Sequence, residues 1–182
     1  MLINGCPVWA TIIVAILAGL AAGLVTGLLH TLLGIPDILA GILTQIALYS
    51  INLNIMGKSN LPISYRNYTL VVSASNINMA ILVGLGICAV VIAAMYWYFG
   101  TEQGSTIRST GSNPAMSKAQ GININVAKVI ALALSNGLVA LAGGLLSQYQ
   151  GFADVNMGRG AIVIGLAAVI IGEVIFGKIF KN

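Results

Sequence analysis

Long apolar runs, separated by short polar segments, dominate the hydropathy pattern of this 182-residue chain. Five runs, at residues 9–29, 36–56, 77–99, 126–146 and 161–180, are each close to 20 residues long. A helix needs roughly 20 residues to cross the ~30 Å hydrocarbon core of a bilayer, whereas a membrane β-barrel would show segments of ~10 residues. We therefore predict an all-α, polytopic membrane helix bundle of about five transmembrane helices, forming a single domain over residues 1–182.

Charged residues are too few for a soluble domain. Such a domain carries about 25% charged residues, whereas this chain has 7%, with 58% hydrophobic residues and a mean hydropathy of +0.99. Its net charge of +4 comes from basic residues scattered near the ends of the runs, where lipid headgroups account for them. We therefore expect a lipid membrane as a partner, and no nucleic acid. Cys6 and Cys88 lack metal-ligand spacing, so we expect no metal site.

Basic residues also predict the orientation of the chain in the case that all five runs cross the membrane. One side then carries Arg108, Lys118, Lys128, Lys178 and Lys181. The other side carries Lys58, Arg66 and Arg159. Because cytoplasmic loops are enriched in Lys and Arg, we expect the polar segment around Arg108 in the cytoplasm and the N-terminus outside.

Small residues recur at four-residue intervals within three of the runs. They are Ala15, Gly19, Gly23 and Gly27 in the first, Ala80, Gly84 and Cys88 in the third, and Ala168 and Gly172 in the last. Such ridges let helix backbones approach closely, which matters in lipid because the hydrophobic effect does not drive helices together there. The pattern therefore predicts tightly packed helices.

No set of side chains indicates catalysis. His30, the sole histidine of the sequence, stands at the end of the first run without a nearby nucleophile or metal cluster. The stretch GEVIFGK at residues 172–178 fits part of a phosphate-binding loop, but it lies inside an apolar run and lacks the final Ser or Thr. We therefore expect no enzyme activity and no cofactor, with ATP hydrolysis on a separate chain. Asp37, which follows Pro36, is expected to cap the second helix.

Polar side chains inside the runs are the candidates for contact with a solute. In the second run they include Gln45, Tyr49, Asn52 and Asn54. Uncharged polar groups at membrane depth either hydrogen-bond to neighbouring helices or line a wet cavity. Glu173 in the last run is open to two interpretations, a structural hydrogen bond or a place in a pathway or gate, because a carboxylate in lipid is costly unless it is paired, protonated or hydrated.

The polar segment RSTGSNPAMSKAQG at residues 108–121 predicts a short helix of about two turns. Asn113 is a good N-cap, Pro114 suits the first helical position, and Gly121 suits the left-handed position after the helix. A helix of ~7 residues is marginal alone in water, so packing must hold it. Its apolar face, Ala115, Met116 and Ala119 with Lys118 beside it, either rests on its own bundle or docks into another protein.

These residues resemble the cytoplasmic loop of ABC importer permeases of the ribose and branched-chain amino-acid type. The matching positions are Arg108, Gly111, Asn113, Ala119 in a shifted place, Gly121, Ile122 and Asn123. Residues 27–57, with GIPDILAGILTQ, and residues 158–173, GRGAIVIGLAAVIIGE, are similar to two further blocks of the family. The resemblance is strongest to permeases paired with binding proteins of the tryptophan and tyrosine type. Members of the family are longer, so the chain is expected to be shortened at both ends.

The resemblance implies an ATP-driven importer in a bacterial plasma (inner) membrane, passing a small solute, with an amino acid as the expected cargo. It implies three protein partners: an ABC ATPase subunit that binds the ATP, an extracytoplasmic solute-binding protein, and a second permease subunit in a homodimer. The cytoplasmic coupling loop would be residues 101–125. The residues expected to dock the ATPase are Arg108, Gly111, Asn113, Pro114, Met116, Lys118 and Gly121.

Two other classes of protein compete with this interpretation. The first is a small channel or structural membrane protein without ATP coupling, whose loop helix only packs at the membrane surface. Solute flux that continues without ATP hydrolysis would favour it. The second, a membrane-embedded enzyme, lacks the clustered nucleophile, base or metal ligands that it would need.

Overall fold

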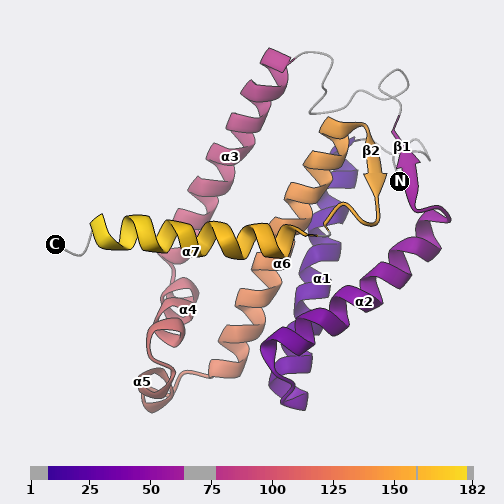
Figure 1. The fold of residues 1–182 in the computed structure, drawn as a ribbon. Helices are drawn as coiled ribbons and strands as arrows, with labels where there is room; N and C mark the ends of the chain where they lie inside the picture. The colour runs from indigo at the N-terminus through magenta and orange to yellow at the C-terminus, as the bar shows by residue number, and fades with distance from the viewer. Residues whose placement is uncertain (1–7, 64–76, 159, 180–182) are drawn as a thin grey trace.

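A computed structural model of the chain describes residues 8–63, 77–158 and 160–179. These residues form helices and one small sheet, as Figure 1 shows. The helices are α1 (Val8–Leu33), α2 (Asp37–Met56), α3 (Ile77–Phe99), α4 (Glu102–Ser112), α5 (Pro114–Ala119), α6 (Ile124–Gln150) and α7 (Ala161–Ile179). The strands are β1 (Asn60–Pro62) and β2 (Phe152–Asp154). The predicted all-α, polytopic fold is confirmed, and four predicted runs correspond to α1, α2, α3 and α6.

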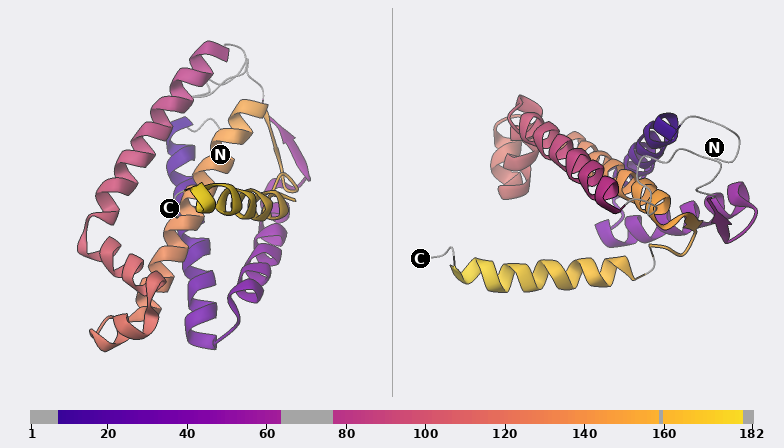
Figure 2. Two further views of the ribbon diagram at one scale, coloured as in Figure 1. Left: turned by 60° about the vertical axis from the view of Figure 1, so that its left-hand side comes forward. Right: turned by 90° about the horizontal axis from the view of Figure 1, so that it is seen from above.

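Four helices, α1, α2, α3 and α6, are long and apolar enough to cross a membrane in the described part of the chain. The fifth predicted run forms α7, in which the apolar stretch with described side chains, Val163–Ile175, is shorter than these spans. Figures 1 and 2 show α7 running across the other helices and to one side of them. The prediction of about five transmembrane helices therefore agrees approximately with the structure: four described helices meet the length and hydropathy of a span, and the fifth run forms the apolar helix α7.

The core of the fold is the packing of α1 against α6. Gly19, Gly23 and Gly27 of α1 lie directly on the α6 backbone, and a Cβ atom added at Gly27 would come 2.9 Å from the Cα of Val129. The fit is reciprocal, since a Cβ added at Gly137 of α6 would lie 3.0 Å from Cδ2 of Leu20. The ridge predicted for the first run is confirmed as the contact surface that brings two helix backbones together.

At their glycines, the other two predicted ridges have open space in the described residues, although Ala80 on α3 is buried. No atom lies within 4 Å of the position that a Cβ would take at Gly84 of α3 or at Gly172 of α7. Cys88 on α3 is exposed. Within the described chain, α3 is attached mainly through α4, at the end that Figure 1 shows at the bottom.

A two-stranded antiparallel sheet joins the segment after α2 to the segment after α6. Asn60 pairs with Asp154 and Pro62 with Phe152. Gly57 and Gly151, which end α2 and α6, have φ angles of +65° and +73° that favour glycine. The sequence predicted loops in both places, because strands of three residues show no recognisable alternation. Cys6, Arg66, Arg159 and Lys181 lie outside the described residues.

Candidate functional site

The predicted coupling loop begins with a helix, α4, that the sequence analysis missed. Thr101 caps it, accepting a hydrogen bond on Oγ1 from the amide of Gly104 at 3.4 Å. Gly104 is buried against the backbone of Tyr98 and Phe99, where any Cβ would collide. This contact folds α4 back on the end of α3. Arg108 and Gly111, predicted as loop residues, are exposed positions on α4.

The short helix predicted after Asn113 is α5, and its N-terminus has the predicted cap. The Asn113 Oδ1 atom accepts a hydrogen bond from the amide of Met116 at 3.1 Å, and Pro114 occupies the first helical position. The Ser117 hydroxyl donates to the Asn113 carbonyl oxygen at 3.1 Å. The bond to the Met116 amide satisfies one of the backbone donors that a helix N-terminus leaves free.

The C-terminus of α5 also ends as predicted, at Gly121, whose φ angle is +83°. The amide of Gly121 donates to the carbonyl oxygen of Lys118 at 3.0 Å. The amide of Ile122 donates to the carbonyl oxygen of Ser117 at 3.1 Å. These two bonds form a Schellman motif. Asn123 then caps α6 by accepting from the amides of Asn125 and Val126. Residues 120–123 are therefore a short junction between α5 and α6 that is held by the hydrogen bonds of two adjoining caps.

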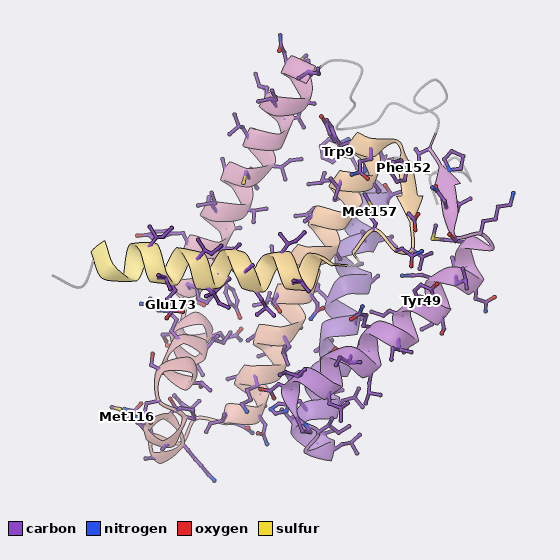
Figure 3. The ribbon with its side chains drawn as sticks, viewed as in Figure 1. Trp9, Tyr49, Met116, Phe152, Met157 and Glu173 are labelled. Atoms are coloured by element: carbon purple, nitrogen blue, oxygen red, sulfur yellow. The ribbon has the colours of Figure 1, made fainter. Side chains whose placement is uncertain are left out.

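The apolar face of α5 points away from the rest of the described chain. Met116 is 58% exposed, and Figure 3 shows its side chain directed outward at the corner of the fold. Ala115, Lys118 and Ala119 are exposed as well. The residue turned inward is Ser117, at 1% exposed. In the described residues, this face does not rest on its own bundle, which was the first of the two interpretations.

An open groove of about 360 Å³ lies between α4 and α6. Thr106 and Ile107 of α4 form one wall, and Val126 and Ile130 of α6 form the other. The groove begins at Ile122, in the α5–α6 junction. The helix pair that carries α5 is thus loosely packed along this side.

The predicted pathway residues are not brought together. Gln45, Asn52 and Asn54 are exposed on α2 and Tyr49 is half-buried there. Glu173 is exposed on α7, and Figure 3 shows it far from Tyr49. Their role in a pathway stays a prediction. Among the described residues, no three His, Cys, Asp or Glu side chains gather as metal ligands would.

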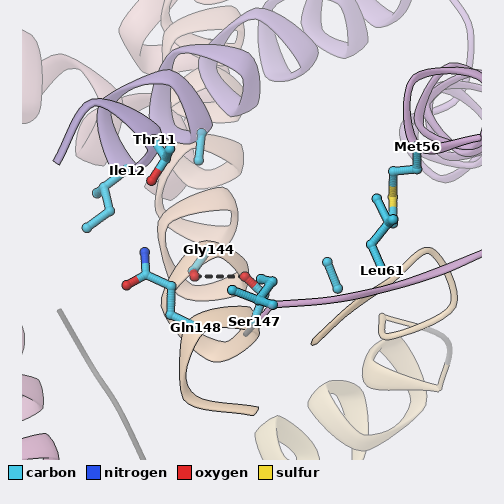
Figure 4. A pocket seen from close by; sticks show the side chains of 10 residues that line it. Thr11, Ile12, Met56, Leu61, Gly144, Ser147 and Gln148 are labelled. Atoms are coloured by element: carbon cyan, nitrogen blue, oxygen red, sulfur yellow. Dashed lines mark hydrogen bonds between the residues drawn. The ribbon is translucent and has the colours of Figure 1, made fainter. Parts of the chain in front are cut away.

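A separate cavity of about 250 Å³ lies at the end of the fold opposite α5 (Figure 4). Thr11 and Ile12 of α1, Met56 of α2, and Ser147 and Gln148 of α6 contribute to its lining. Gln148 is only 2% exposed. None of the predicted pathway residues lines this cavity.

A polar cluster at the end of α1 was not predicted. The Nδ1 atom of His30 lies 2.6 Å from Oδ1 of Asp37 and 2.8 Å from the Ile35 carbonyl oxygen. Its Nε2 atom lies 3.0 Å from Nζ of Lys128 on α6. Asp37 is in the first turn of α2 as expected, and its side chain contacts His30. The turn between His30 and Asp37 was visible in the sequence, whereas nothing linked either residue to Lys128.

Two comparisons set this chain beside known proteins. The family described as "Branched-chain amino acid transport system / permease component" matches residues 1–181. The tyrosine transport system permease protein of Clostridioides difficile (strain R20291) is 46% identical over 142 residues, which are 78% of this chain and 46% of that protein. The chain thus spans about half the length of this curated relative. No solved structure matches it significantly.

Proposed function

We propose that this chain, which belongs to the family of branched-chain amino acid transport system permease components, is the membrane-spanning permease subunit of an ATP-driven ABC importer in a bacterial inner membrane. In this proposal α5 docks into a separate ATPase subunit, which binds and hydrolyses the ATP. The permease itself binds no cofactor. An extracytoplasmic binding protein delivers the solute, and a second copy of the permease completes the pathway.

The observation that carries the proposal is the geometry of α5. A helix of six residues is too short to be stable alone, yet both its ends are capped while its apolar face, with Met116, and the adjacent Lys118 are exposed. Capping fixes the shape of the helix without covering this face. Such a surface suits insertion into a groove on a partner, with Met116 as the apolar anchor.

The connection of α5 to the spans supports the transfer of motion. Residues 120–123 join α5 to α6 through two adjoining caps, so a displacement of α5 reaches the first turn of α6 directly. Because α6 and α1 interlock through Gly19, Gly23 and Gly27, they would move as one body. ATP-driven closure of the ATPase would then tilt this pair between inward-facing and outward-facing states. The permease makes and breaks no covalent bond in this scheme.

The solute proposed is an amino acid, with tyrosine and the branched-chain amino acids as the first candidates. The relative is named for tyrosine transport and the family for branched-chain amino acids. The polar side chains of α2, which include Gln45, Tyr49 and Asn52, are the proposed contacts along the pathway. Glu173 on α7 is the proposed gate residue.

Site-directed crosslinking tests the docking. Cysteines at Met116 and at Lys118, in a variant with serine at Cys6 and Cys88, are expected to crosslink to a co-expressed ATPase subunit. A cysteine at Leu33, which is exposed at the same end of the fold on α1, is the matched control and is expected to give no adduct. Equal yields at Leu33 and Met116, or no adduct at either α5 position, would contradict the proposal.

Uptake measurements separate an importer from a channel. Vesicles containing permease, ATPase and binding protein are loaded with ATP or with a non-hydrolysable analogue, and uptake of labelled tyrosine and leucine is followed. The proposal expects uptake only with hydrolysable ATP. Uptake of the same rate with the analogue would show a channel without ATP coupling.

A further inference from the structure

The cavity at the end of the fold opposite α5 has a polar side and an apolar side. Thr11 of α1 and Ser147 of α6 lie on one side, and Met56 of α2 and Leu61 of β1 lie on the other, as Figure 4 shows. Its volume is about 250 Å³. Since an apolar cavity of about 150 Å³ is large enough to bind benzene, this one has room for a small molecule with a short alkyl chain.

The walls of the cavity come from elements that are joined to one another beside it. A Cβ atom added at Gly144 of α6 would lie 3.6 Å from the Cβ of Ala15 on α1, so these two helices are in contact at the cavity. Leu61 pairs with Ala153 in the small sheet, and both residues line the cavity. The cavity is therefore formed before any ligand arrives, as is usual for small-molecule sites.

Each of the two hydroxyl groups donates its proton to a backbone carbonyl. Oγ1 of Thr11 donates to the carbonyl oxygen of Val8 at 2.6 Å, and Oγ of Ser147 donates to that of Gly144 at 2.9 Å, the bond drawn in Figure 4. A hydroxyl that donates its proton keeps its lone pairs as acceptors. In the described part of the chain, no group donates to either oxygen. The polar side therefore offers acceptors to a ligand.

The charge of the ligand follows from this chemistry. No charged side chain lines the cavity among the described residues, and Gln148, which is 2% exposed in the lining, has a partner already. A carboxylate beside the two hydroxyls would meet acceptors where it needs donors, which is costly in a buried place. An ammonium group has three donors and no acceptor. Two of its donors suit Thr11 and Ser147, and the third can reach water through the open side of the cavity.

We propose that this cavity is a binding site for a primary ammonium compound with a short alkyl chain, such as an aliphatic amino acid. Thr11 and Ser147 bind the ammonium group, and Met56 and Leu61 contact the alkyl chain. The carboxylate of an amino acid stays in water at the open side, so an alkylamine without a carboxylate binds as well. The inference rests on the proposed function only for its place in transport, where this end of the fold would receive the solute from outside.

Three small probes test the recognition of the ammonium group. Isopentylamine has the branched chain and an ammonium group, isocaproate has the same chain and a carboxylate, and leucine has both charged groups. Binding is followed by saturation-transfer NMR on the whole chain in phosphatidylcholine nanodiscs, whose lipid has no net charge, and empty nanodiscs measure partition into the lipid. Saturable binding is expected for isopentylamine and leucine, and binding at least roughly tenfold weaker for isocaproate.

Substitutions of the two hydroxyls test their role. Thr11→Val and Ser147→Ala are each expected to weaken the binding of isopentylamine roughly fivefold or more, because each removes an acceptor for a charged donor. Thr11→Ser keeps the hydroxyl and should bind as the native chain does. Ser135→Ala is the matched control, since the Ser135 hydroxyl also donates to a carbonyl on α6, that of Leu132 at 3.0 Å, and lies outside the cavity.

Equal binding of isocaproate and isopentylamine would overturn the proposal, as would native binding of isopentylamine in both Ser147→Ala and Thr11→Val. A signal no larger than that of empty nanodiscs would also refute it, and would be expected if a lipid chain filled the cavity. If Thr11→Val does not fold, Ser147→Ala against Ser135→Ala decides. ATP-driven uptake without binding of isopentylamine would refute this site and leave the importer, whereas binding without such uptake would refute the importer and leave this site.

Discussion

The hydroxyl of Thr26 on α1 donates a hydrogen bond to the hydroxyl of Thr44 on α2, with 2.9 Å between the two Oγ1 atoms. Both residues are buried. Thr44 in turn donates to the carbonyl oxygen of Ala40 on its own helix at 2.9 Å. The two hydroxyls thus link α1 and α2 by a hydrogen bond. Figures 1 and 2 show these two helices diverging away from the turn that joins them.

Removing the hydroxyl of Thr44 is expected to weaken the α1–α2 contact. Thr44→Val keeps the shape of the side chain and should lower the free energy of unfolding in mixed micelles by about 0.5–1.5 kcal/mol, the range for hydrogen bonds between membrane helices. Thr31→Val is the control, because the Thr31 hydroxyl donates to the carbonyl oxygen of Gly27 on the same helix and, among the described residues, to no other helix. Equal losses in both variants would show that the bond between helices has no special weight.

The glycine ridge of α1 should tolerate no side chain. In Gly23→Ala the new Cβ would meet the backbone of Leu132 and Ala133, at 2.6 Å from the Cα of Ala133, so we expect a loss of about 1–3 kcal/mol in unfolding free energy. Gly41→Ala on α2 is the matched control, since nothing lies within 4 Å of its added Cβ. A Gly23→Ala variant as stable as Gly41→Ala would mean that the α1–α6 backbones are not in contact.

Two glycines on either side of α5 should respond oppositely to alanine. Gly121→Ala places a Cβ at a φ of +83°, which costs about 1–2 kcal/mol. The amide of Ile122, bonded to Ser117, should then exchange with deuterium roughly fivefold faster or more. Gly111→Ala, within α4 and with open space around its Cβ, should leave that exchange unchanged or slow it. Similar exchange rates in the two variants would contradict the Schellman ending of α5.

Replacing a polar residue of α2 should slow transport, whereas replacing its apolar neighbour should not. If the pathway runs along α2, Asn52→Ala removes one hydrogen-bonding group and should slow ATP-dependent uptake of labelled tyrosine roughly two- to tenfold. Ile51→Ala, at the adjacent exposed position, is the control and should transport at the native rate. Uptake lowered equally by both variants would point to a general defect in α2 and away from a solute contact at Asn52.

The local structure of α5 could be read from the sequence because each signal acts within a few residues. Asn113 caps through its own side chain, Pro114 has a fixed φ, and Gly121 adopts a φ that other residues avoid. The glycine ridge of α1 was predictable for the same reason, since it lies on one helix face. Its partner, α6, could not be named from that pattern.

The missed elements depend on contacts between distant residues. The sequence of α4, EQGSTIRSTGS, is rich in Ser, Thr and Gly, which are weak helix formers. Its helix is held by the Thr101 cap and by the close approach of Gly104 to α3. His30 and Lys128 are 98 residues apart, and no local pattern links them. The orientation of α7 likewise depends on what surrounds it.

The short pairing of β1 with β2 connects α2 to α6 a second time, at the end opposite His30. At one end, α2 is pinned to α1 and α6 through Asp37, His30 and Lys128. At the other end, β1 follows α2 and β2 follows α6, so Leu61 opposite Ala153 pins the same two helices again. A helix that is held at both ends can rotate about its own axis but cannot tilt away from its neighbours. If α2 changes the side chains that it exposes, this change is therefore expected to come from rotation about the helix axis. Such a rotation would move Gln45, Tyr49 and Asn52 together.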